Sequence, residues 1–160
     1  MDEYIMSNDK QDLLERCYFP SSISVAEEIP EGIKFEIKKI QDRQKLMIRQ
    51  KSACDVSFND QYAECNDFDA ISIEKLCITL IRAFNCDCYI IMSKIKEVNV
   101  HLLGEMIEKS FFELNELGEL NGLGFNLSIS FEYFNLKLDE LLLYYNYLYP
   151  DNKIDHLIDL

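Results

Sequence analysis

The chain has 160 residues and a mass of 18.8 kDa, a size at which a single domain with its own apolar core is expected. Hydrophobic residues make up 48% of the chain and charged residues 28%, which excludes a disordered protein. The 16 basic and 29 acidic residues give a formal net charge of -13, which excludes a general nucleic-acid-binding protein because such proteins present a basic surface.

Hydrophobic periodicity divides the chain into helices and strands. Turn residues and helix-capping residues mark most of the boundaries between them. In chain order, the sequence predicts a helix (8–18), an extended connection (21–32), a hairpin (33–51), a strand (53–58), an acidic loop (59–69), a helix (71–84), a strand (86–92), a helix (99–117), a strand (125–134), a helix (136–149) and an acidic tail (150–160).

Residues 33–51 are the clearest predicted hairpin. Ile33, Phe35 and Ile37 alternate with charged residues, which is the period of a half-buried strand. Residues 41–43 supply the turn, and the alternation resumes after it. We therefore expect the first strands of an antiparallel sheet here.

The segment after residue 70 predicts a core in which helices and strands alternate. In the helix at 71–84, apolar residues recur every three or four positions. Residues 86–92 are apolar on both faces, as in a central strand, and Gly118 is expected to end the long helix that follows. Residues 125–134 alternate strictly between apolar and polar side chains, which indicates a strand.

Together these elements predict an α+β fold, with a mainly antiparallel sheet of about four to five strands and helices packed on it. No linker, repeat or break in composition indicates a second domain. Within the single domain we distinguish an N-terminal helix and connection (1–32), a basic β-hairpin region (33–58), a helix–strand core (71–149) and an acidic tail (150–160).

The six cysteines are expected to be reduced thiols. The N-terminus is acidic where a secretory signal would be basic and then apolar, and no apolar run reaches the roughly 20 residues of a membrane span. We therefore expect a cytoplasmic protein, in which thiols stay reduced. Cys86 and Cys88 would share one face of a strand, but zinc sites usually combine two cysteine pairs. We predict no metal and no cofactor.

The sequence shows no catalytic constellation. The two histidines, His101 and His156, have no neighbouring residues that suggest a nucleophile or an acid–base pair. Phosphate-binding and nucleophile-elbow motifs are absent, and the acidic loop at 59–69 lacks the spacing of a calcium-binding loop. We therefore expect a non-enzymatic protein with no catalytic residues.

Charge is distributed unevenly along the chain. Residues 33–52 hold seven basic residues and two acidic ones, whereas the predicted helix at 99–117 carries glutamates around an aromatic residue on one face. Such a face is either simply solvated or an acidic surface that attracts a basic partner. The candidate partner-binding residues of this region are Glu105, Glu108, Phe112, Glu113, Glu116 and Glu119.

The predicted last helix, at 136–149, is apolar around almost its whole circumference. Such a helix is either the centre of the core or the carrier of an exposed tyrosine-rich patch. Tyrosine is enriched at binding interfaces, so Tyr144, Tyr145 and Tyr147 are further candidate partner-binding residues. Homodimerisation through this helix is an alternative use of the same patch.

A small, strongly acidic chain without a catalytic constellation resembles, in its overall profile and without a shared motif, the immunity proteins of bacterial toxin systems. Small phage-encoded inhibitors have the same profile. The resemblance implies a non-enzymatic intracellular protein that neutralises a nuclease-like toxin by tight binding through an acidic surface. The expected partner is then a basic protein, and neither nucleic acid nor a membrane is bound directly.

An alternative is a structural, scaffolding or viral host-interaction protein. It would homodimerise through the Leu/Tyr-rich helix at 136–149 and touch an acidic surface with the basic residues of 33–52. An enzyme whose site combines Cys86, Cys88 and the acidic loop is a third interpretation.

Overall fold

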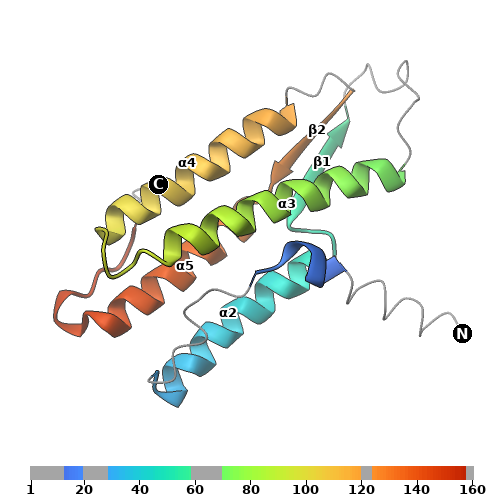
Figure 1. Ribbon diagram of the computed structural model, residues 1–160. Helices are drawn as coiled ribbons and strands as arrows, with labels where there is room; N and C mark the ends of the chain where they lie inside the picture. Colours follow the sequence, from blue (N-terminus) through green and yellow to red (C-terminus); the bar gives the residue numbers. More distant parts are fainter. Residues whose placement is uncertain (1–12, 20–28, 59–69, 120–123, 158–160) are drawn as a thin grey trace, which may run out of the picture.

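The computed structural model describes residues 13–19, 29–58, 70–119 and 124–157. In these residues, long helices pack together and a two-stranded sheet lies beside them (Figure 1). The elements are α2 (Glu31–Arg49), β1 (Cys54–Phe58), α3 (Ala70–Met92), α4 (Val100–Glu119), β2 (Phe125–Ile129), α5 (Phe131–Leu148) and the 3-10 turn η3 (Pro150–Asn152), and residues 13–17 are also helical.

This architecture contradicts the expected α+β fold. The described residues contain one sheet of two strands instead of a mainly antiparallel sheet of four to five strands. The chain is predominantly helical because two segments predicted as strands are helical, and a third strand is shorter than predicted. The predicted acidic loop (59–69) lies outside the described residues, as do residues 8–12 of the predicted first helix and residues 21–28 of the extended connection; residues 13–17 of that predicted helix are helical.

The predicted basic hairpin is a single helix, α2. Pro30 precedes it, its first turn holds Glu31 and its last turn holds Arg49, an order that suits the helix dipole. Its buried residues are spaced three or four positions apart, as a helix requires, and they are Ile37, Gln41, Gln44, Met47 and Ile48. Two of the five are glutamines, so the apolar residues by themselves do not show the helical period. The apolar residues instead follow a strand-like alternation that includes Phe35, although Phe35 is 66% exposed in the helix.

The predicted strand at 86–92 is the last part of α3. Cys86 is therefore exposed and Cys88 buried, on different sides of one helix instead of on one face of a strand. The predicted strand at 125–134 ends at Ile129, because Ser130 caps α5. The Ser130 hydroxyl accepts a hydrogen bond from the backbone N–H of Tyr133 at 3.2 Å.

Two predicted strands are confirmed in position and paired with each other. β1 lies within the predicted strand at 53–58, and β2 covers the first half of the predicted strand at 125–134. They run antiparallel, with Cys54 opposite Ile129 and Phe58 opposite Phe125. The helices predicted at 71–84 and 99–117 are present as parts of α3 and α4.

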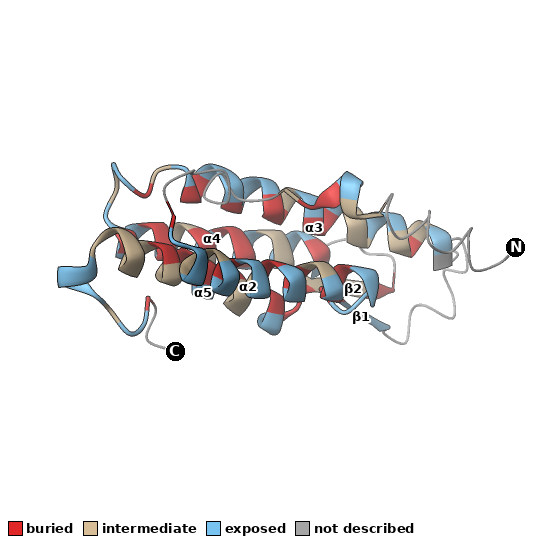
Figure 2. Cartoon of the chain, turned by 90° about the horizontal axis from the view of Figure 1, so that it is seen from below, coloured by how far each residue is buried: buried red, intermediate tan, exposed pale blue. Residues whose placement is uncertain are grey.

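The helices share one core. α2 packs against α5, α4 packs against α3, α5 and β2, and α2 and α4 lie on opposite sides of α5 (Figure 1). The buried residues of the long helices lie mainly where the helices face one another (Figure 2). Aromatic rings fill the centre, where Phe111 stacks on Phe134 at a centroid distance of 4.3 Å and Phe84 touches Phe111 edge-on at 6.4 Å.

A buried polar network joins α2 to α5. The Gln44 amide bridges a buried cation and a buried anion: its oxygen accepts from Lys137 Nζ at 3.0 Å, and its nitrogen donates to Glu140 Oε1 at 3.5 Å. Gln41 donates to the other Glu140 oxygen at 3.1 Å, and the Tyr18 hydroxyl donates to the Gln44 oxygen at 3.0 Å. These hydrogen bonds fix the register between the two helices, since an unsatisfied buried charge is costly.

Candidate functional site

The helix that carries the predicted acidic residues, α4, is held firmly by its buried side. Asn99 starts it, because the Asn99 side-chain oxygen accepts from the backbone N–H of His101 at 2.8 Å. Leu103, Ile107 and Phe111 are then buried at spacings of four residues. This spacing places them along one stripe of the helix and turns the remaining side toward solvent.

Polar contacts fix both flanks of α4. On one flank, the Ser110 hydroxyl donates to the Asp87 carboxylate of α3 at 2.8 Å. On the other, the Asn115 side-chain oxygen accepts from the backbone N–H of Ile129 in β2 at 2.7 Å. Gly118 lies so close to the backbone of β2 that an added Cβ would overlap the carbonyl oxygen of Leu127. The outward side chains of α4 therefore project from a rigid support.

The structure brings the predicted acidic residues together on the outward side of α4. Glu105, Glu113, Glu116 and Glu119 are exposed, and Glu108 is half-buried. Lys109 lies among them and forms an ion pair with Glu113 at 3.7 Å, with both side chains largely solvent-exposed. Such an exposed pair contributes little to stability, so this side of the helix remains strongly acidic.

Three large apolar side chains are exposed among these glutamates. Phe112 is 57% exposed, and its ring contacts Phe111 edge-on at 5.3 Å. Leu102 is 48% exposed and Leu117 is 65% exposed. Of these three, the sequence had indicated only Phe112. The signal for Leu117 was its position between Glu116 and Glu119, and the signal for Leu102 was its spacing of three residues from Glu105 on the same helix. We call the set the α4 face: Leu102, Glu105, Glu108, Phe112, Glu113, Glu116, Leu117 and Glu119.

The structure places the three candidate tyrosines in α5. Tyr144 is buried, whereas Tyr145 and Tyr147 are half-buried. Tyr147 borders a shallow groove of about 380 Å³ together with Ile33 of α2 and Pro150. The structure therefore does not bring Tyr147 to the α4 face, and α5 is the central core helix, one of the two interpretations left open above.

The basic residues predicted as a hairpin form the exposed sides of α2 and of the turn after it. Two of them bind acidic residues of neighbouring helices: Arg43 contacts Glu132 at 2.6 Å, and Lys51 contacts Glu74 at 3.3 Å. Because α2 and α4 lie on opposite sides of α5 (Figure 1), the basic and acidic residues are carried by different sides of the helical core.

His101 and His156 are both exposed. Within the described ranges, no group of three or more histidine, cysteine, aspartate or glutamate residues could hold a metal ion. None of the helices in these ranges is long and apolar enough to cross a bilayer. The acidic side chains of residues 59–69, which sequence analysis considered for metal binding, lie outside the described part of the chain.

Comparison with known families identifies the unit that these helices and strands form. The model of the SNIPE associated domain family matches residues 30–151, well over half of the chain. The chain belongs to this family. The match begins at Pro30, directly before α2, and ends inside η3, so the SNIPE associated domain comprises α2 to α5 with both strands. No curated protein and no solved structure matches the chain.

Proposed function

We propose that this SNIPE associated domain is a non-enzymatic binding domain that engages a basic protein partner through the α4 face. The observation that carries the proposal is the combination of clustered glutamates with Leu102, Phe112 and Leu117 exposed on a helix whose other side is fixed in the core.

Each part of the α4 face has a distinct physical role. The glutamates speed the encounter with a basic surface, because attraction between opposite charges raises association rates about 10- to 1000-fold at low salt. The exposed apolar side chains supply affinity once they are buried against the partner, and Phe112 is the largest of them. A rigid helix lowers the entropy lost on binding.

The structure favours this surface over α5, the helix considered for homodimerisation. Leu138, Leu141 and Tyr144 of α5 are buried within the chain itself. Its one large apolar side chain that is prominently exposed is Phe131, at its first position. Because α4 exposes three large apolar side chains, we place the binding surface there.

The family description supports a role beside another domain or protein, since it names an associated domain. Binding through an acidic surface would also cover the basic surface of the partner and so neutralise its activity. The narrower prediction, that the partner is a toxin and this chain its immunity protein, stays a prediction.

The experiment uses the tagged full chain as bait in a lysate of its native host, in parallel with two charge-reversed baits. The test variant is Glu105→Lys/Glu116→Lys on the α4 face. The control is Asp151→Lys/Asp155→Lys, which changes the net charge equally at exposed positions outside α4. A basic protein retained by the wild type and the control and lost from the test variant is the expected result.

The purified partner then allows the mechanism to be measured. For wild type and control, association should slow at least about 10-fold between 20 and roughly 300 mM salt, whereas Glu105→Lys/Glu116→Lys should bind slowly at both concentrations. Phe112→Ala should increase the dissociation rate and leave the salt dependence intact. The proposal is refuted if partner recovery is the same with all three baits, or if the bait is recovered alone as a salt-resistant dimer.

A further inference from the structure

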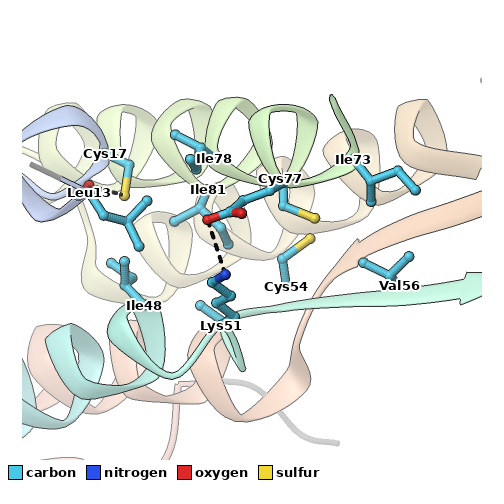
Figure 3. A pocket seen from close by; sticks show the side chains of 12 residues that line it. Leu13, Cys17, Ile48, Lys51, Cys54, Val56, Ile73, Cys77, Ile78 and Ile81 are labelled. Atoms are coloured by element: carbon cyan, nitrogen blue, oxygen red, sulfur yellow. Dashed lines mark hydrogen bonds and ion pairs between the residues drawn. The ribbon is translucent and has the colours of Figure 1, made fainter. Parts of the chain in front are cut away.

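An apolar cavity of about 240 Å³ lies between the end of α2, β1, α3 and the helical segment at residues 13–17 (Figure 3). An ion pair between Lys51 and Glu74 forms part of its wall, with a distance of 3.3 Å between the charged atoms. Half of its lining residues are branched and apolar: Leu13, Ile48, Val56, Ile73, Ile78 and Ile81. Cavities of this size and lining admit small uncharged molecules.

Two cysteines meet in this cavity. Cys54 is the first residue of β1, Cys77 lies in the second turn of α3, and their sulfur atoms face each other across the cavity (Figure 3). Within the described residues all cysteines are free thiols. The pair is therefore a dithiol.

The environment makes the two sulfurs unequal. The hydrogen bond between the two sulfurs stabilises the Cys77 thiolate and so lowers the pKa of Cys77 below the usual thiol value. The same hydrogen bond and burial raise the pKa of Cys54. By contrast, burial raises the pKa of Cys17 to about 11 and that of Cys88 to about 12, so both stay protonated. Cys77 is therefore suited to attack and Cys54 to resolve.

We propose that Cys54 and Cys77 form a peroxide-reactive dithiol that closes into a disulfide between β1 and α3. The Cys77 thiolate attacks one oxygen of a small peroxide, the O–O bond breaks, and Cys77 becomes a sulfenic acid while the leaving oxygen takes up a proton. The Cys54 sulfur then attacks the Cys77 sulfur, the S–S bond forms and the S–O bond breaks. Hydrogen peroxide thus accepts two electrons, and two thiols give one disulfide and two waters.

The disulfide has a measurable mechanical consequence. It joins two elements that are separated in sequence by the segment at 59–69, and so restricts the unfolded chain more than the folded one. For a domain of this size, closing such a loop should raise the melting temperature by about 5–10 °C. Reduction with dithiothreitol should reverse the shift.

The test uses the reduced full chain, treated with equimolar hydrogen peroxide and then digested for mass spectrometry. We expect one intramolecular link between the Cys54 and Cys77 peptides, a mass loss of about 2 Da, and the higher melting temperature. Cys86→Ser removes an exposed thiol outside the cavity and serves as the matched control; it should behave as the wild type. Cys54→Ser should leave Cys77 as a sulfenic acid that dimedone traps.

Three outcomes overturn the proposal. They are a first bond that involves Cys65 or Cys86, an intermolecular dimer formed while Cys54 and Cys77 remain free thiols, and oxidation of Cys77 at the rate of a free cysteine peptide without subsequent bond formation. The wild-type experiment decides between these outcomes even if a serine variant does not fold.

Discussion

Gln44 should be one of the most sensitive positions in the chain, although it is an uncharged polar residue on a helix with many charges. Its side chain is fully buried, and it connects Lys137, which is 3% exposed, to Glu140, which is 1% exposed. The informative substitution is Gln44→Leu, because leucine nearly preserves the volume and removes every hydrogen bond. A loss of stability would then reflect the polar network and not a cavity.

The expected loss follows from the groups left behind. The Lys137 ammonium and the Tyr18 hydroxyl each lose an acceptor at 3.0 Å, and Glu140 loses one of its donors. Disrupting a buried ionic network by removing one member costs about 3–5 kcal/mol. With a urea dependence of about 2 kcal/mol per molar, the unfolding midpoint should fall by roughly 1.5–2.5 M.

Urea titration followed by circular dichroism at pH 7 measures this shift. The matched control is Gln50→Leu, the same exchange at an exposed position directly after α2, which should change stability by less than about 0.5 kcal/mol. The double variant Gln44→Leu/Lys137→Met also removes the stranded ammonium and should be more stable than Gln44→Leu alone. A single-variant loss below about 1 kcal/mol, or a double variant no more stable than the single one, would refute the bridging role.

Two further predictions concern packing and pH. Gly118→Ala should lower the free energy of unfolding in urea by at least about 3 kcal/mol, because the added Cβ would lie 2.9 Å from the carbonyl carbon of Leu127 and closer still to its oxygen. Gly32→Ala is the control: its Cβ meets nothing within 4 Å, so it should be neutral or stabilising. Burial raises the pKa of Tyr18 and Tyr133 above the usual tyrosine value of 10.0. Above about pH 10 these two hydroxyls therefore ionise in the unfolded chain but not in the folded one, and the free energy of unfolding falls by about 1.4 kcal/mol per pH unit for each residue. Alkaline unfolding should show this slope, and Tyr133→Phe should reduce it; an unchanged slope would contradict the assignment.

Sequence patterns predicted elements well where apolar residues dominate the buried face. Three such elements are present: the helix at 99–117, the strand at 53–58, and the strand from residue 125 onward that pairs with it. The pattern failed at α2 because Gln41 and Gln44 occupy core positions, which hides the helical period. It failed at the end of β2 because Ser130 could equally continue an alternating strand or cap a helix.

The candidate sites differ in the same way. The glutamates of α4 and Phe112 could be assigned to one face because they lie on a single helix, where spacing determines direction. Cys54 and Cys77 lie on different elements and belong to no motif. Only the packing of α3 against β1 brings the two sulfurs together, and no spacing rule in the sequence expresses that contact.

The buried network also fixes where the basic surface of α2 lies relative to the acidic α4 face. α2 carries four exposed basic residues, Lys38, Lys39, Arg43 and Arg49, and α4 carries the acidic face on the other side of α5. A basic partner is therefore attracted to α4 and repelled from α2, so the field selects an orientation as well as a surface. Because Gln44, Lys137 and Glu140 hold α2 in one register against α5, the two charged surfaces keep a fixed relation. Weakening that network should therefore loosen the orientation in which the partner binds, while the α4 face itself stays intact.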